Sequence, residues 1–84
     1  MPTDLPKAFG SVLRTHRKRK GWSQMTCATA AGMHLNALGN LERGMRNPSL
    51  QTVFLLCEAL GVGIGEFMSD VETEAKRLSR RRKD

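Results

Sequence analysis

The sequence has no long hydrophobic run, and no stretch approaches the roughly 18 consecutive apolar residues that a membrane-spanning helix needs. The N-terminus also lacks the apolar segment of a secretory signal peptide, because Asp4, Pro6 and Lys7 interrupt it. These two absences predict no contact with a membrane. We therefore expect a cytoplasmic protein.

Cysteine is scarce, and no arrangement of residues typical of an enzyme is present. The two cysteines, Cys27 and Cys57, and the nearby His34 lack the paired close spacing of a zinc site. No nucleophile with its base and no phosphate-binding glycine loop is found. We expect a chain without enzyme activity, metal or cofactor. Both cysteines sit among apolar residues at helical spacing, which predicts free thiols packed as small hydrophobic groups.

The formal net charge of the whole chain is +6, and acidic residues are few in its first half. Residues 14–46 carry seven Lys and Arg against Glu42 alone, whereas residues 47–75 carry five acidic residues and no basic one. Residues 76–84 are basic again. A basic half suits phosphate binding, because neutralised phosphates release condensed counterions. The alternative interpretation is a solvated charged surface without a partner.

The pattern of apolar residues predicts helices, with no strand pattern and no internal repeat. The chain of 84 residues is enough for one compact domain with a small core. The predicted helices span about 5–20, 24–31, 35–43, 50–60 and 64–69. Ser23 and Ser49 are N-cap residues for the second and fourth helices. The glycines that end the first four helices are Gly21, Gly32, Gly44 and Gly61.

Apolar residues at helical spacing mark the packed faces. In the first helix these are Phe9, Val12, Leu13 and His16; in the fourth they are Leu50, Val53, Phe54, Cys57 and Leu60. After Ser69 they thin to Val71, Ala75 and Leu78, whose spacing allows a helical extension. We expect one folded domain over residues 1–69 and a charged, partly disordered extension over residues 70–84, mobile from Arg80 onward.

The segment from Gln24 to Leu41 has the residue pattern of two short helices that cross at a steep angle. Ala28 is small where the two helices press together, and Gly32 allows the turn a positive φ at little cost. Leu38 and Leu41 then point back into the core. The remaining apolar positions of this unit are Cys27, Ala31 and Met33. The pattern predicts a helix-turn-helix; the alternative is an ordinary helical hairpin.

Several short motifs add to this pattern. They are Trp22-Ser23-Gln24, Leu41-Glu42-Arg43-Gly44, Asn47-Pro48-Ser49-Leu50 and Ala59-Leu60-Gly61-Val62. Together they resemble the XRE family of helix-turn-helix regulators, which includes lambdoid repressors, Cro proteins, restriction–modification controller proteins and some antitoxins. The resemblance covers about residues 9–68. It implies a five-helix, all-α lambda-repressor-like fold and a recognition helix in the major groove. It also implies a homodimer on a palindromic operator.

The resemblance implies roles for residues in the first three helices. Arg17 matches an arginine that pairs with a glutamate at the position of Glu42, which is a structural role. Gln24 matches a position that reaches the DNA backbone or supports a base-reading residue. Ser23 either caps its helix or also binds a phosphate, and His34 either caps the third helix or donates to a phosphate.

The face of the third helix opposite Leu38 and Leu41 is expected to meet DNA. Asn36 and Asn40 are the leading base readers, since asparagine pairs with adenine in the major groove. Arg43 and Arg46, at the exit of the helix, suit phosphate contact, and for Arg46, in the loop, contact with a base edge is the alternative. Leu35 suits a thymine methyl group, and Gly39 permits a close approach to DNA. The alternative for each of these residues is an ordinary solvent-exposed position.

A single recognition helix contacts few bases, so specificity favours a dimer. We predict that Ile64, Phe67 and Met68 form its interface, with Phe54 and Leu56 as further candidates; alternatively, Ile64 and Phe67 only complete the monomer core. The predicted function is a transcriptional regulator. The alternative is an antitoxin or protein-interaction module that also binds its own promoter, with the C-terminal extension as the site for a protein partner.

Overall fold

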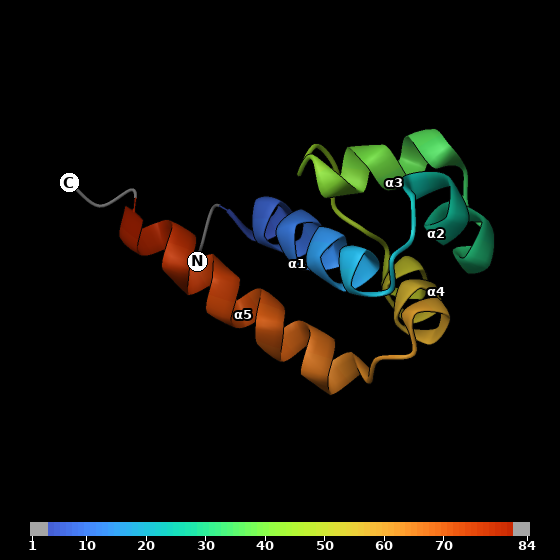
Figure 1. Cartoon of the computed structure of the whole chain (residues 1–84). Helices are drawn as coiled ribbons and strands as arrows, with labels where there is room; N and C mark the ends of the chain where they lie inside the picture. Colours follow the sequence, from blue (N-terminus) through green and yellow to red (C-terminus); the bar gives the residue numbers. More distant parts are fainter. Residues whose placement is uncertain (1–3, 82–84) are drawn as a thin grey trace.

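The computed structural model describes residues 4–81, which form five helices and no strand (Figure 1). The helices are α1 (Leu5–Arg19), α2 (Gln24–Ala31), α3 (Leu35–Glu42), α4 (Leu50–Leu60) and α5 (Ile64–Arg81). The all-α fold class predicted from the sequence is confirmed.

Local sequence signals set the ends of α2 and α4. Ser23 Oγ accepts a hydrogen bond of 3.1 Å from the Thr26 amide, and Ser49 Oγ accepts one of 3.1 Å from the Thr52 amide. Each bond satisfies an amide that the first turn of a helix leaves unpaired. Gly32 ends α2 in the left-handed conformation, with φ of 68°. Both helices therefore span the residues that the caps predict.

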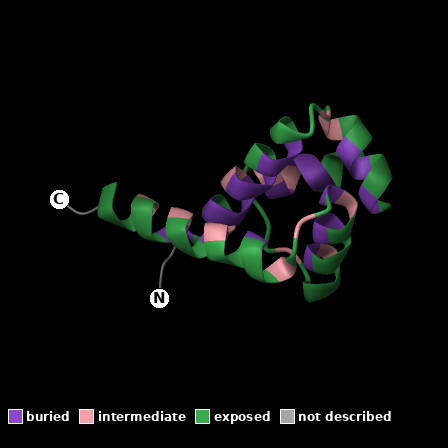
Figure 2. Cartoon of the chain, turned by 60° about the horizontal axis from the view of Figure 1, so that its bottom comes forward, coloured by how far each residue is buried: buried purple, intermediate pink, exposed green. Residues whose placement is uncertain are grey.

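The core lies where α1 packs against α5 on one side and against α3 on the other. Leu13, Leu38, Leu56 and Phe67 are fully buried in it. The rings of Phe9 and Phe67 join α1 to α5, with centroids 5.3 Å apart. Figure 2 shows buried residues gathered where the helices face one another and exposed residues on their outer sides. The side of α3 that faces the core therefore holds this helix in place, and its other side remains outside the core.

The fifth helix is longer than predicted. It continues past Ser69 without interruption as far as Arg81 and runs alongside α1 (Figure 1). Val71 and Ala75 are buried, and Leu78 packs against the same core. The boundary expected after residue 69 therefore falls inside α5, because these widely spaced apolar residues cover α1. The mobility predicted from Arg80 onward is not found for Arg80 and Arg81, which belong to α5, and residues 82–84 lie outside the described residues.

The apolar stripe predicted on α4 is partly wrong. Val53, Cys57 and Leu60 are buried as expected, but Leu50 and Phe54 are 74% and 56% exposed. Leu56, a candidate for the dimer surface, is instead fully buried in the core. Leu50 and Phe54 therefore lie on the solvent side of α4, and Val53, Leu56, Cys57 and Leu60 form its buried side.

A close approach that the sequence did not reveal joins α1 to the end of α3. A Cβ atom on Gly10 would stand 2.6 Å from the carbonyl oxygen of Glu42 and closer still to that of Leu41. Real Cβ atoms are not found at such distances from backbone atoms, so only glycine fits here. Gly10 thereby lets α1 support the C-terminal end of α3.

Two further findings concern the helices and the titratable side chains between residues 4 and 81. Taken one at a time, the helices include none that is long and apolar enough to cross a membrane. The pair α4 and α5 meets that test of length and composition only when joined across a bend of 109°. No three His, Cys, Asp or Glu side chains within this range stand together in a way that suits a metal ion.

Candidate nucleic-acid interface

Helices α2 and α3 pack through a small crossing point and a tight turn. Ala28 is 1% exposed, and its carbonyl oxygen accepts a hydrogen bond of 2.9 Å from the Met33 amide, which closes the turn after Gly32. Leu38 and Leu41 point from α3 into the core. The residues predicted to build the helix-turn-helix therefore lie together as the pattern requires, and the other face of α3 is turned outward.

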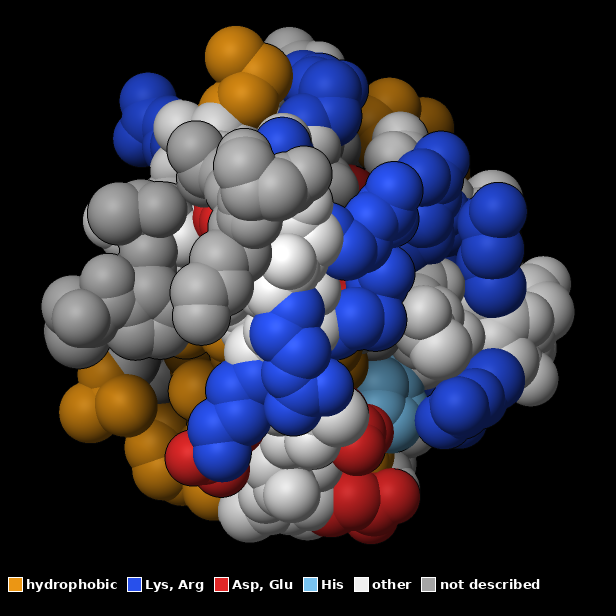
Figure 3. All heavy atoms as spheres, turned by 90° about the vertical axis from the view of Figure 1, so that its left-hand side faces the viewer, with side chains coloured by type: hydrophobic (Ala, Val, Ile, Leu, Met, Phe, Trp, Pro, Cys, Tyr) orange, Lys and Arg blue, Asp and Glu red, His pale blue; other side chains and the backbone are white. Residues whose placement is uncertain are grey.

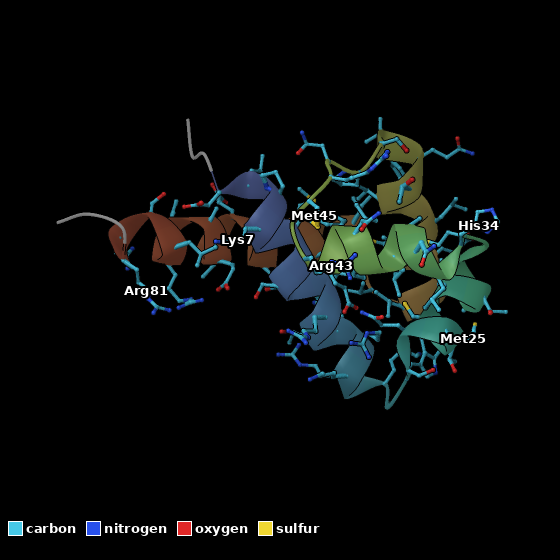
Figure 4. All side chains as sticks on the ribbon, turned by 90° about the horizontal axis from the view of Figure 1, so that it is seen from above. Lys7, Met25, His34, Arg43, Met45 and Arg81 are labelled. Carbon is cyan, nitrogen blue, oxygen red and sulfur yellow. The ribbon has the colours of Figure 1, made fainter. Side chains whose placement is uncertain are left out.

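The outward face of α3 carries polar side chains one turn apart. Asn36 and Arg43 are exposed, Asn40 is half-buried between them, and Leu35 is 39% exposed at the start of the helix. His34 and Arg43 mark the two ends of α3 in Figure 4. A short helix with amide and guanidinium groups on its solvent side has the size and hydrogen-bonding capacity to enter a major groove.

Gly39 does not have the exposed position expected for a residue that contacts DNA. It is buried, because the Arg43 side chain turns back along α3 and covers it. Arg43 Nη2 also donates a hydrogen bond of 2.6 Å to Asn40 Oδ1. The sequence places these two residues at helical spacing, but the contact itself was not predicted.

A buried carboxylate fixes the orientation of α3 relative to α1 and α2. Arg17 donates to Glu42 from Nε at 2.6 Å and from Nη2 at 3.0 Å, and its Nη1 donates to the Trp22 carbonyl oxygen at 2.8 Å. Gln24 Nε2 donates to Glu42 Oε1 at 2.9 Å. The side chains of Arg17 and Glu42 are 9% and 3% exposed. Arg17 and Glu42 therefore have the structural position that the resemblance implies.

Burial alone would raise the pKa of the Glu42 carboxyl. The hydrogen bonds from Arg17 and Gln24, together with the positive charges of Arg17 and Arg14, outweigh this effect and lower the pKa below its usual value. Glu42 is thus held as an anion inside the protein. Burial also raises the pKa of the free Cys27 and Cys57 thiols, so these groups stay protonated.

Ser23 and His34 occupy the N-cap positions that the sequence predicts. Ser23 caps α2 through the Thr26 amide, and its hydroxyl also donates to Thr26 Oγ1 at 3.0 Å. His34 stands in extended conformation before α3, but its side chain makes no cap hydrogen bond. The exposed imidazole therefore remains available to an external acceptor.

An open groove runs beside α3, bounded on its other side by the segment that leads into α4. It has a volume of about 870 Å³. The polar side chains along it include His34, Asn36, Asn40, Arg46 and Ser49. Arg46 is exposed and lies in the loop after α3. The two sides of the groove thus place most of the predicted DNA-contacting residues around one surface.

Charge is separated over the molecule. Exposed basic residues crowd the end of α1, at Arg14, Lys18, Arg19 and Lys20, while the first turns of α5 are acidic. Figure 3 views the side on which α5 ends, and Lys and Arg side chains cross that face with Asp and Glu gathered below them. A basic end of α1 and acidic first turns of α5 make the charge distribution uneven, and an uneven distribution favours approach to a polyanion in one orientation.

The residues predicted for a dimer interface have different environments. Phe67 is 0% exposed and its ring packs against Phe9 at a tilt of 58°, so it belongs to the monomer core and its side chain does not reach the surface. Ile64 is half-buried against the core, whereas Met68 is 40% exposed. The prediction is therefore wrong for Phe67. The exposed large apolar side chains of α4 and α5 are Leu50, Phe54, Leu55 and Met68.

Known proteins share both the sequence pattern and the fold. Residues 13–67 match the family model described as helix-turn-helix. The HTH-type transcriptional regulator y4dJ of Sinorhizobium fredii is 35% identical over 69 residues, which cover 82% of this chain and 90% of that protein. The crystal structure of the clp gene regulator ClgR from Corynebacterium glutamicum superposes with a TM-score of 0.89. It is 25% identical, and the match covers 96% of this chain and 86% of that one.

A second solved structure has higher identity. The restriction–modification controller protein C.AhdI from Aeromonas hydrophila superposes with a TM-score of 0.72 and is 39% identical. The match covers 74% of this chain and 94% of that one. The family-model match, residues 13–67, runs from within α1 into α5 and so includes all of α3.

Proposed function

Since this chain belongs to the XRE family of helix-turn-helix transcriptional regulators, which bind DNA and are not enzymes, we propose that it reads operator DNA through α3. In this proposal α3 lies in the major groove and two copies bind a palindromic site. The observation that supports it best is the two-sided character of α3. Leu38 and Leu41 anchor one side, and Asn36, Asn40 and Arg43 present hydrogen-bonding groups on the other.

The surroundings of α3 suit a DNA backbone on either side. Arg46 lies in the loop beyond the helix, and Ser23 and His34 lie at the starts of α2 and α3. Leu35 offers an apolar contact for a thymine methyl group. Gln24 acts indirectly in this scheme, because its amide is held by Glu42 and sets the position of the recognition helix.

The exposed apolar residues of α4 and α5 are the proposed dimer surface. Phe54 is 56% exposed and Met68 is 40% exposed, so both offer apolar surface to a second copy. A second copy using the same surface forms a two-fold symmetric pair, and the symmetry places two recognition helices on two half-sites. A protein that binds operator DNA in this way works in the cytoplasm.

Selection from a random-sequence duplex library tests this function. The full chain is expected to enrich duplexes that carry two inverted copies of one short sequence. Asn36→Ala is expected to lower affinity for the selected duplex more than for a scrambled one, because it removes a base contact. Failure to enrich any sequence, or equal loss on both duplexes with intact folding, would contradict the proposal.

The alternative, a module that captures a protein partner through a C-terminal extension, would be favoured by an extension that becomes ordered only on binding. Residues up to Arg81 are already helical, and Val71 and Ala75 pack in the core of the free chain. The packing of α5 therefore supports a structural role for this segment, and we propose the regulator alone.

A further inference from the structure

The hydrogen bond between Asn40 and Arg43 changes what α3 presents to DNA. Arg43 Nη2 donates to Asn40 Oδ1 at 2.6 Å, and the guanidinium group lies over Gly39 instead of extending beyond the helix. A Cβ atom on residue 39 would stand 3.3 Å from Arg43 Nη1, which is tighter than an ordinary contact. The absence of a side chain at Gly39 thus provides the space in which Arg43 turns back.

The direction of this hydrogen bond matters for base recognition. A lone asparagine offers one acceptor and one donor, which match the amino group and N7 of adenine. In this structure Asn40 Oδ1 already accepts one hydrogen bond from Arg43, which takes one of its two lone pairs. The groups that the pair presents are therefore mostly donors, namely the Asn40 amide nitrogen and the unused guanidinium N–H groups, since arginine has no acceptor.

Guanine is the base that complements such a set of donors. Its major-groove edge carries two neighbouring acceptors, N7 and O6, whereas adenine and cytosine each place a donating amino group there. Thymine offers one acceptor beside a methyl group. We propose that Asn40 and Arg43 act as one unit that reads guanine, with Arg43 contacting the base and Gly39 and Asn40 positioning it. This inference rests on the proposed function and adds the base class that α3 selects.

The proposal replaces two expectations based on residue type alone. Asn40 by itself predicted an adenine contact, and Arg43 by itself predicted a phosphate contact that is indifferent to sequence. Their mutual hydrogen bond favours guanine over both expectations, because it engages Asn40 Oδ1 and holds Arg43 over the outward face of α3 (Figure 4).

The test uses the full chain and duplexes selected from a random-sequence library. Each guanine of the selected half-site is replaced in turn by 7-deazaguanine, which removes N7 and keeps the Watson–Crick edge. One replacement is expected to weaken binding of the unmodified protein by about tenfold, which corresponds to the loss of part of a bidentate base contact. Arg43→Ala is expected to show no further loss on that modified duplex. Arg46→Ala, which removes an exposed arginine outside the pair, is the matched control and is expected to keep the full 7-deazaguanine effect.

Two variants test positioning separately from direct contact. Gly39→Ala is expected to raise the melting temperature, because alanine favours the helix, and to reduce the preference for guanine over adenine several-fold. Asn40→Ala is expected to reduce the same preference while much of the overall affinity remains. The double variant Asn40→Ala/Arg43→Ala is expected to be no worse than Arg43→Ala alone, since coupled residues are not additive.

The outcomes separate this inference from the function on which it rests. Enrichment of a palindromic site at which no 7-deazaguanine replacement weakens binding would overturn the guanine assignment and leave the regulator function intact. The same holds if Arg43→Ala lowers affinity equally for the selected duplex and for one with that guanine changed to adenine. Failure to enrich any duplex would overturn both.

Discussion

Gln24 Nε2 donates a hydrogen bond of 2.9 Å to Glu42 Oε1, so the first residue of α2 is fastened to the last residue of α3. Arg17 of α1 binds the same carboxylate through two nitrogen atoms. One buried anion therefore joins the three helices that set the angle of the recognition helix. A residue of α2 that the sequence suggests for DNA contact serves here to hold α3 in place.

Removing this anion is expected to destabilise the whole fold. Glu42→Ala leaves the guanidinium of Arg17, whose side chain is 9% exposed, without its partner. The loss of one member of a buried pair costs about 3–5 kcal/mol of unfolding free energy. Urea denaturation measures the change, and Glu58→Ala, at an exposed carboxylate of α4, is the control. A Glu42→Ala protein with unchanged thermal stability would reject the structural role.

Glu74 gives the protein an acid-sensitive contact between α5 and α1. Hydrogen bonds from Arg77, reinforced by one of 2.8 Å from Ser11, outweigh burial and lower its pKa from 4.5 to about 2. Because the folded state binds this proton less readily than the unfolded state, the contribution is complete above pH 4.5 and is lost as the pH falls towards 2. Glu74→Gln is therefore expected to be less stable at neutral pH and to lose less stability on acidification.

Urea denaturation across that pH range measures the Glu74 effect. The change is expected to be small, because Arg77 is 50% exposed. Glu72→Gln is the matched control on the same helix, since its carboxylate is exposed and lies 3.8 Å from Lys76. If Glu72→Gln and Glu74→Gln show the same pH dependence, the contact between α1 and α5 does not account for it.

The proposed dimer surface makes a prediction about association without DNA. Phe54→Ser removes an aromatic group that is 56% exposed, so it is expected to leave the monomer folded and to raise the dimer dissociation constant about tenfold or more. Sedimentation equilibrium at micromolar concentration measures the mass. Met45→Ser is the control, because Met45 is 68% exposed in the loop after α3 and belongs to neither α4 nor α5. A Phe54→Ser chain with the dimer mass would place the interface elsewhere.

The sequence predicts those parts of the fold that short-range chemistry determines. The serine caps and left-handed glycines locate α2 and α4, because each signal acts within a few residues. The length of α5 was harder to predict, since Val71 and Ala75 lie in a strongly charged segment and matter only because α1 lies opposite them. Phe67 shows the same difficulty: its apolar character suits a dimer surface or a core, and only the packing decides.

The candidate interface also has features that the sequence predicts and features that it does not. Exposure of Asn36, Asn40 and Arg43 follows from helical periodicity once Leu38 and Leu41 are placed inside. The hydrogen bond between Asn40 and Arg43 does not, because it depends on the rotamer of a long side chain and on the space above Gly39. Residue type predicts which face meets DNA, and side-chain geometry decides which hydrogen-bonding groups that face displays.

Gly10 provides the sharpest test of how α1 supports the recognition helix. By helix propensity alone, Gly10→Ala should stabilise α1 by about 1 kcal/mol. In this structure the added Cβ atom would meet the carbonyl oxygen of Glu42 at 2.6 Å, and relief requires a shift of the α3 backbone. We therefore expect a net loss of about 1–3 kcal/mol in unfolding free energy. Operator affinity is expected to fall as well, because the end of α3 that carries Arg43 moves.

Gly65→Ala is the matched control for Gly10→Ala. Gly65 lies in the first turn of α5, and no atom stands within 4 Å of the position its Cβ would occupy, so alanine is expected to be neutral or stabilising there. Urea denaturation followed by circular dichroism compares the two variants, and fluorescence anisotropy measures their affinity for the selected duplex. Stabilisation by both substitutions would mean that α1 and α3 are not in close backbone contact. If Gly10→Ala lowers the unfolding free energy and Gly65→Ala raises it, the contact at Gly10, and not helix propensity, decides the effect of the substitution.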